Sequence, residues 1–227
     1  MDQMETEPDP AEQAALISTH RVVSSVMGLL TRSDIGPPPD IPSGPAIYVA
    51  NHRSLADLLL ASIAFCSWGR PIRPLVASSY FRKPAIGPLL SRLRCIPVDG
   101  HEALELATSE IEAGWSVAIM PEGRVVPVEE WTADGIGRLR FGVGRLALDT
   151  GLPVVANGAS GTEAFWPRGS ALPRIRPWRR YPLALRSEVL GAITADSPRE
   201  ATEVVRGALV RCVEQADAAT GLMRRSR

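Results

Sequence analysis

Short apolar runs alternate with helix-like stretches along most of this chain. The apolar runs are short enough for buried strands and lie at 46–50, 72–77, 95–98, 117–120, 153–156 and 181–185. Apolar residues with helical spacing lie between several of these runs, at 55–66, 102–113 and 136–149. Such alternation is typical of βαβ units, so the sequence predicts an α/β fold with a mixed, largely parallel sheet flanked by helices.

The last predicted helix has the clearest boundaries. Ser197 can cap it, Pro198 can occupy its first position, and Glu200 can complete a capping box. Apolar residues then recur at i, i+3 and i+4 spacing, which predicts a buried stripe. The members of that stripe are Ala201, Val204, Val205, Ala208, Leu209, Cys212, Val213 and Ala216.

An amphipathic helix is predicted at 14–30, ahead of the main domain. Its apolar side carries Leu16, Ile17, Val23, Val26, Met27 and Leu30. His20, Arg21 and four Ser or Thr residues interrupt the segment, so it lacks the ~20 apolar residues that a spanning helix needs. The apolar side can pack on the protein itself or lie in a membrane interface, and the sequence leaves both open.

These elements predict one main domain with two leading segments. The 227 residues fit a single α/β domain. Residues 1–12 are acidic and contain proline, unlike a secretory signal, and they predict a disordered tail. Residues 13–45 comprise the amphipathic helix and a Pro-rich connector, and residues 46–222 comprise the main domain.

Charge and cysteine content exclude several classes of protein. The 25 Lys and Arg residues balance 25 Asp and Glu residues, so no overall field attracts nucleic acid, and no nucleic-acid partner is expected. Cys66, Cys95 and Cys212 are odd in number and lack CxxC spacing, which favours neither a disulfide framework nor a zinc site. We therefore expect a protein of a reducing compartment that binds no metal.

The first candidate for chemistry is a turn between an apolar run and a helix. His52 directly follows the run at 46–50, and such turns hold ligands in open α/β sheets. Asp57 lies five residues later, on the first turn of the next helix, where it can accept a proton from one imidazole nitrogen. A carboxylate in this position orients the ring and stabilises the imidazolium, so the pair predicts a general base. Taken alone, a structural histidine explains the same pair.

The second candidate is the turn Met120-Pro121-Glu122-Gly123-Arg124. It also follows an apolar run, so it is expected at the same edge of the sheet as His52. Glu122 is predicted to bind acceptor hydroxyls, and backbone N–H groups near Gly123 are predicted to help define the site. Taken alone, an ordinary loop explains this turn as well.

Together these motifs resemble the glycerolipid acyltransferase superfamily, typified by the lysophosphatidic acid acyltransferases. The NHxxxxD motif runs from Asn51 to Asp57, the Pro-Glu-Gly turn follows, and Gly-Leu-Pro-Val-Val comes next at 151–155. The resemblance covers roughly residues 47–169. It implies an O-acyltransferase of phospholipid biosynthesis in which His52 is the base and Asp57 orients it.

The resemblance also implies the substrates and the place of action. The donor is expected to be acyl-CoA or acyl carrier protein, whose thioester an acceptor hydroxyl of a lyso-lipid attacks directly, with no cofactor. The enzyme is expected at the cytoplasmic face of the membrane as a peripheral protein. The residues expected to bind substrate are Asn51, Arg53, Ser54, Glu122, Gly123 and Arg124.

The chain departs from the superfamily where an acceptor phosphate is expected to bind. Arg124 comes one position early, Gly100 replaces an arginine after Asp99, and Ser78 replaces a lysine. A phosphate monoester normally needs several charge-assisted bonds, so the sequence leaves open a non-phosphate acceptor. The cations that can compensate are Arg53, Arg82, Lys83, Arg92 and Arg94.

A second basic segment extends from Trp166 to Arg180. It contains two tryptophans and five arginines, and both residue types suit a lipid headgroup interface. A solvated loop with paired arginines is the alternative.

Rival interpretations also make distinct predictions. One rival is a serine hydrolase with Ser54 as nucleophile, but the sequence lacks its GxSxG motif. Another is a non-enzymatic lipid- or acyl-carrier-binding descendant of the fold, which would not need the intact His52–Asp57 pair. An unrelated α/β domain predicts that His52, Asp57 and Glu122 do not converge. His20 and His101 match no motif and are expected at the surface or at helix caps.

Overall fold

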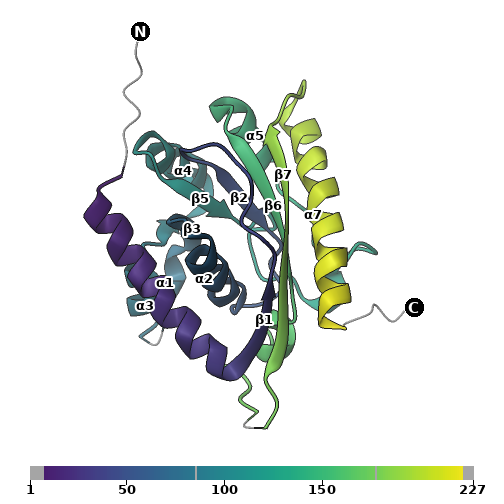
Figure 1. The fold of residues 1–227 in the computed structure, drawn as a ribbon. Coiled ribbons are helices and arrows are strands. Elements are labelled where there is room, and N and C mark those ends of the chain that lie inside the picture. The colour runs from purple at the N-terminus through teal and green to yellow at the C-terminus, as the bar shows by residue number, and fades with distance from the viewer. Residues whose placement is uncertain (1–7, 85, 177, 222–227) are drawn as a thin grey trace.

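A single sheet organises the computed structural model, which describes residues 8–84, 86–176 and 178–221 (Figure 1). Its strands are β1 (Thr31–Ile35), β2 (Ile47–Ala50), β3 (Ile72–Ala77), β4 (Ile96–Val98), β5 (Ser116–Ile119), β6 (Pro153–Ser160) and β7 (Tyr181–Ala192). Within these described ranges the order is β1-β7-β6-β2-β5-β3-β4, and every pairing is parallel except that of β6 with β7. The predicted mixed, largely parallel sheet is therefore confirmed.

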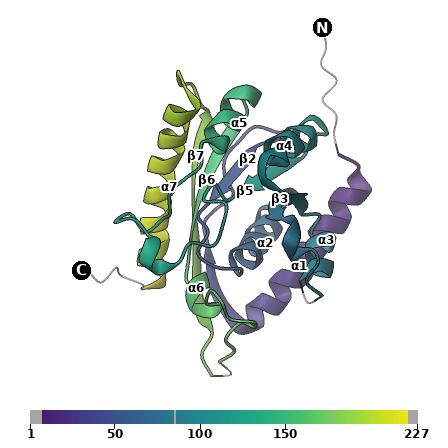
Figure 2. The same cartoon turned by 180° about the vertical axis from the view of Figure 1, so that it is seen from behind.

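Helices cover both faces of the sheet (Figure 2). One face packs against α1 (Pro10–Leu30), α2 (Asp57–Trp68), α3 (Gly87–Arg92) and α6 (Thr162–Phe165). The other packs against α4 (Ala103–Glu112), α5 (Gly142–Thr150) and α7 (Pro198–Thr220). Along β2, Tyr48 joins the first core while Ile47 and Val49 join the second, because successive strand residues point to opposite faces. Short 3-10 turns lie at Ser78–Tyr80, Gly100–Glu102 and Val128–Glu130.

The edge strand β1 was not predicted, and it changes the expected domain boundary. Thr31–Ile35 is polar at alternate positions and pairs with the first half of β7, so it shows no continuous apolar run. Because β1 belongs to the same sheet as the remaining strands and α1 packs on α2, residues 13–45 form no separate unit. The connector at 36–45 is irregular, as expected.

Helix α1 begins earlier than predicted. Asp9 accepts a hydrogen bond from Ala11 N at 2.9 Å, and Pro10 occupies the first turn. The predicted disordered tail is therefore wrong for residues 10–12, while residues 1–7 lie outside the described residues. None of the helices in the described ranges is long and apolar enough to cross a membrane.

The buried side of α1 packs on the protein itself. Leu16, Val23 and Met27 are buried there, whereas Val26 is 53% exposed, contrary to prediction. His20 is also buried, so its expected surface position is wrong; burial lowers its pKa to about 4. Its ring meets Phe65 edge-on, with centroids 5.6 Å apart. The side chain of His101 lies outside the described part of the chain.

Helix α7 is close to its prediction. Ser197 Oγ accepts from Glu200 N at 3.2 Å, and the Glu200 carboxylate accepts from Asp196 N at 3.0 Å. The predicted stripe is buried except for Val204, which is 43% exposed. On β6, a Cβ added to Gly158 would lie 2.2 Å from the backbone of Cys212, so glycine permits the close approach of helix and sheet.

Candidate active site

The predicted motifs meet at one edge of the sheet. Strands β6, β2 and β5 are neighbours and run parallel, so the segments that follow them meet at their carboxyl ends. The backbone N–H of His52 donates to Glu122 Oε2 at 2.5 Å, and the N–H of Val126 donates to the His52 carbonyl oxygen at 2.9 Å. This convergence excludes the interpretation in which the motifs are coincidental.

His52 and Asp57 form the expected pair. Nδ1 of His52 lies 3.0 Å from Asp57 Oδ2, and Asp57 is the first residue of α2, as predicted. Because Nδ1 faces the carboxylate, Nε2 is the nitrogen that can exchange a proton with a substrate. The His52 side chain is 21% exposed, whereas that of Asp57 is 1% exposed, so the imidazole is reachable from solvent and its partner is shielded.

Three further donors hold the Asp57 carboxylate in place. Oδ2 accepts from the backbone N–H groups of Arg53 and Ser54, each at 2.8 Å. Oδ1 accepts from Thr162 Oγ1 at 2.5 Å. With both oxygens bonded, the carboxylate is fixed at the angle from which it orients His52.

Glu122 supports the turn at 51–56 that carries His52, called the catalytic turn below for its proposed role, instead of facing an acceptor. Its side chain is buried, and its second oxygen, Oε1, accepts from Gly137 N at 2.6 Å. Burial raises the pKa of Glu122, although the two backbone donors oppose that shift. Since each oxygen is bonded to a backbone N–H, the predicted binding of acceptor hydroxyls is replaced by a positioning role.

Asn51 and Ser54 are likewise engaged inside the protein. Asn51 Nδ2 donates to Ala159 O at 3.0 Å, and Asn51 Oδ1 accepts from Ala159 N at 2.7 Å, so its amide continues the pairing of β2 with β6. Ser54 Oγ donates to Trp166 O at 2.6 Å and is buried. Neither is available to substrate, and Ser54 is no nucleophile.

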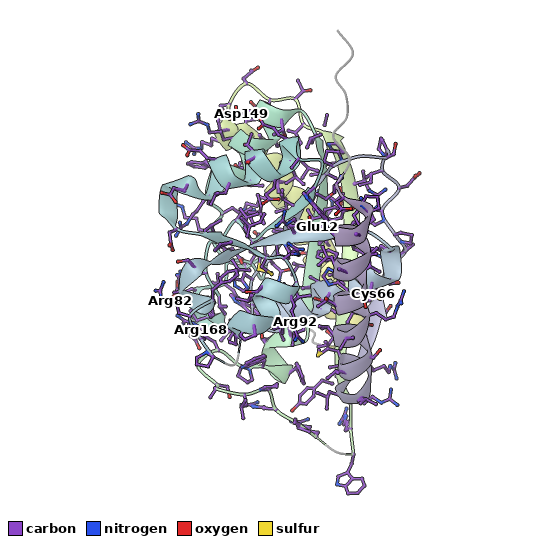
Figure 3. All side chains as sticks on the ribbon, turned by 90° about the vertical axis from the view of Figure 1, so that its left-hand side faces the viewer. Glu12, Cys66, Arg82, Arg92, Asp149 and Arg168 are labelled. Carbon is purple, nitrogen blue, oxygen red and sulfur yellow. The ribbon has the colours of Figure 1, made fainter. Side chains whose placement is uncertain are left out.

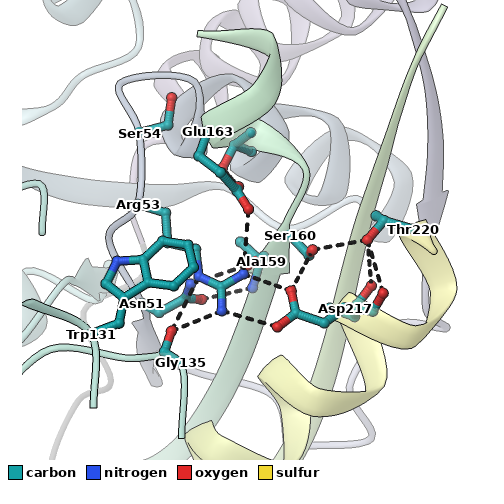
Figure 4. A network of polar contacts seen from close by, with 12 residues as sticks. Asn51, Arg53, Ser54, Trp131, Gly135, Ala159, Ser160, Glu163, Asp217 and Thr220 are labelled. Atoms are coloured by element: carbon teal, nitrogen blue, oxygen red, sulfur yellow. Dashed lines mark hydrogen bonds and ion pairs between the residues drawn. The ribbon is translucent and has the colours of Figure 1, made fainter. Parts of the chain in front are cut away.

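Arg53 lies in a buried network, which corrects its predicted contact with substrate (Figure 4). Its Nη1 and Nη2 donate to the two carboxylate oxygens of Asp217 at 2.6 and 3.1 Å. Nη2 also donates to Gly135 O at 2.8 Å, and the guanidinium lies 4.1 Å from the ring centroid of Trp131. Glu163 Oε1 is 3.6 Å from Nη1. Arg53 thus ties the catalytic turn to the last turns of α7.

A groove of about 1120 Å³ lies beside the catalytic turn. Leu55 and Val126 line it next to His52, and Trp131 and Glu163 cover Arg53. Three exposed cations, Lys83, Arg124 and Arg168, line it in addition to the buried Arg53. Of the predicted substrate-binding set, Arg124 therefore lies where a ligand can reach it, although it also pairs with Glu130. Gly123 has a φ of +71° and lies against the side chain of Arg140.

One family position that lacks a cation, Ser78, bonds to Asp99, the residue before the other such position, Gly100. Ser78 Oγ donates to Asp99 Oδ2 at 2.5 Å, at the ends of β3 and β4. Among the cations predicted to compensate, Lys83 is exposed in the groove. Arg53 also lines the groove but is only 3% exposed, and Arg94 pairs with Glu12 at 3.1 Å. In the view of Figure 3, Arg82 and Arg168 lie on one side of the molecule and Arg92 lies nearer α1.

Several residues of the site carried no usable signal in the sequence. Thr162 and Asp217 lie 105 and 164 residues from their partners Asp57 and Arg53. Gly137 lies in the stretch predicted to be helical at 136–149, but α5 starts only at Gly142, and Trp131 lies outside every predicted element. Gly161 and Thr162 follow β6 within the stretch 47–169 that resembles the superfamily, but only the fold reveals the contact of Thr162 with Asp57.

Comparison with known proteins points to one family. A sequence model described as Acyltransferase matches residues 33–159. The chain is 28% identical over 148 residues to 1-acyl-sn-glycerol-3-phosphate acyltransferase BAT2, chloroplastic, from Brassica napus. That match covers 61% of this chain and 40% of the Brassica protein.

A solved structure shares the fold. The 1-acyl-sn-glycerophosphate (LPA) acyltransferase PlsC from Thermotoga maritima superposes with a TM-score of 0.73 at 20% identity. The superposition covers 96% of this chain and 83% of the Thermotoga chain.

Proposed function

The chain belongs to the Acyltransferase family, and we propose that it moves an acyl group from a thioester to a hydroxyl of a lysophospholipid-type acceptor. The observation that carries the proposal is the His52–Asp57 pair, held by three further donors beside the groove. The names of the Brassica and Thermotoga proteins support the acceptor class.

The proposed mechanism uses His52 as base and then as acid. Nε2 takes the proton of the acceptor hydroxyl as its oxygen attacks the thioester carbonyl carbon, which forms a tetrahedral oxyanion. Asp57 stabilises the imidazolium that results. Collapse of the oxyanion breaks the C–S bond, and the departing thiolate takes the proton from Nε2. The products are an ester and a free thiol, and neither an acyl-enzyme nor a metal is needed.

The donor is proposed to be acyl-CoA or acyl carrier protein. Both present the acyl thioester on a phosphopantetheine arm, so their reactive ends are chemically alike. The groove beside His52 has apolar walls at Leu55, Val126 and Trp131, which suit an acyl chain, and cations at its surface.

For the acceptor, we infer a phosphate-bearing lyso-lipid held by Lys83, Arg124 and Arg168. These three cations come from three separate loops and line one groove, which suits a dianion. A neutral acceptor is the second candidate, favoured because Ser78 occupies the position of a superfamily lysine and bonds to Asp99.

A panel of acceptors and donors tests these proposals together. The purified protein is given lysophosphatidate, lysophosphatidylcholine or monoacylglycerol with radiolabelled acyl-CoA or acyl carrier protein. Transfer is expected to be fastest to lysophosphatidate and to fall ~10²–10⁴-fold in His52→Ala. Lys83→Ala is expected to raise KM for lysophosphatidate but not for monoacylglycerol.

Each other outcome selects an alternative. Preference for monoacylglycerol would identify the neutral acceptor. Tight binding of lyso-lipid or acyl carrier protein without transfer in any combination would identify the non-enzymatic descendant.

A further inference from the structure

The segment between α6 and β7 exposes large apolar side chains. Leu172 is 72% exposed, Ile175 is 66% exposed and Trp178 is 96% exposed. The segment projects beyond the body of the molecule in two perpendicular views (Figures 1 and 3). Exposure of this extent in one segment marks a contact surface, since isolated surface apolar residues are normal but clusters are not.

The same segment is strongly basic. Arg174, Arg176, Arg179 and Arg180 are exposed, and no Asp or Glu occurs between residues 163 and 188. Within the described ranges, none of these four arginines is in an ion pair with a carboxylate. The pairing of these four arginines with acids, which the alternative of a solvated loop required, is therefore not found in the described part of the chain.

The outer side of α1 extends this surface. Arg180 Nη1 donates to the carbonyl oxygen of Gly28 at 3.2 Å, which places the segment beside the end of α1. On the side of α1 that faces away from α2, Val22, Val26 and Leu29 are exposed at i, i+4 and i+7 spacing. The basic segment thus meets the end of α1 that carries these exposed apolar side chains.

We propose that the described residues of 172–180, which are 172–176 and 178–180, form a docking surface for an anionic lipid bilayer together with the outer side of α1. Apolar and arginine residues alternate along the segment, which matches a layer where acyl chains and phosphates lie within a few ångströms. Arginine and tryptophan are also enriched in protein interfaces, so a second copy of the chain is the alternative occupant that the test must separate from a bilayer. Tryptophan is typical of this membrane layer because its ring is both apolar and polar.

The position of the surface also fits the groove. Arg168, Gly169 and Ala171 line the groove, and the docking segment follows directly. A bilayer bound at 172–180 would lie next to the groove, so an amphiphilic ligand could pass between them without crossing water. This surface goes beyond the proposed acyl transfer, and its test requires no turnover.

Vesicle sedimentation of the full chain tests the surface. Vesicles of phosphatidylcholine, with or without phosphatidylglycerol, are titrated at low and high salt. Binding is expected to need phosphatidylglycerol and to weaken with salt. Trp178→Ser is expected to lower the partition coefficient at least ~10-fold, and Arg179→Glu, which reverses one charge, by more than ~5-fold.

Matched controls use exposed residues of α7. Val204→Ser and Arg199→Glu make comparable changes away from the surface, and both should bind as the unaltered protein does. His52→Ala should also bind vesicles normally, so loss of catalysis and loss of docking are separable. Acyl transfer between water-soluble short-chain substrates should be unchanged in Trp178→Ser and Arg179→Glu.

Two results would overturn the proposal. One is vesicle binding that does not depend on the lipid charge and stays unchanged in Trp178→Ser and Arg179→Glu. The other is absence of vesicle binding together with self-association that Trp178→Ser abolishes on size-exclusion chromatography, which would assign the surface to a second copy of the chain.

Discussion

Arg53 and the arginines of 172–180 carry the same charge in opposite surroundings. Arg53 is 3% exposed and bonded to Asp217 and Gly135, whereas Arg174 and Arg179 are exposed and lack ion pairs among the described residues. A buried charge needs its partners. If one partner is removed, the remaining charge lies uncompensated in the protein interior, which solvates it poorly. An exposed charge keeps its hydration and contributes little to stability. Arg53 therefore serves the fold, and the exposed arginines are free to serve binding.

The largest expected effect comes from breaking the buried side of this comparison. Asp217→Ala leaves the guanidinium of Arg53 without its bidentate partner, so the free energy of unfolding should fall by about 3–5 kcal/mol. Urea denaturation measures it. The double variant Arg53→Met with Asp217→Leu removes both charges and should recover most of that loss. Equal losses in the single and double variants would show that the pair is not the cause.

His20 is a second buried ionisable residue but, unlike Arg53, it has no polar partner in the part of the chain that the structure describes. Neither of its ring nitrogens is hydrogen-bonded within the described residues. Burial lowers its pKa to about 4, so the unfolded chain binds a proton below its ordinary pKa of 6.5 while the folded chain does not. Burial of His20 should therefore not reduce the free energy of unfolding above about pH 6.5. As the pH drops below that value, the free energy of unfolding should fall, by roughly 3 kcal/mol at about pH 4. His20→Leu should remove this part of the pH dependence in urea denaturation. An unchanged pH dependence in His20→Leu would refute the assignment.

A smaller effect is expected where the network reaches the catalytic pair. Thr162→Val removes one hydrogen bond to Asp57, worth about 1 kcal/mol, so kcat should fall about fivefold. KM should change little, because Thr162 is buried. Thr162→Ser keeps the hydroxyl and should restore kcat; if it does not, the methyl group and not the hydrogen bond matters.

The smallest effect is expected on the exposed side. Arg174→Ala and Arg179→Ala should each change the free energy of unfolding by less than about 0.5 kcal/mol. The same denaturation experiment measures them beside Asp217→Ala. A loss above about 2 kcal/mol in either would mean that the arginine has a buried role, and the comparison would fail.

Local patterns alone determined much of this protein. The alternation of apolar runs predicted the sheet and both helical layers, and the capping residues at 197–200 predicted the start of α7. The family motif predicted His52 and Asp57, because a spacing of five positions at the turn from β2 to α2 lets the two side chains meet. These features depend on neighbours in the chain, which periodicity and spacing reveal.

Tertiary structure decided the roles of the remaining motif residues. Asn51, Arg53, Ser54 and Glu122 were expected to bind substrate, but they bond to Ala159, Asp217, Trp166 and Gly137, which lie between 15 and 164 residues away. Likewise, β1 is a strand because β7 offers it a parallel edge, and its own residues do not show this. Burial decides whether a polar side chain meets substrate or protein, and burial depends on which distant segments pack over it.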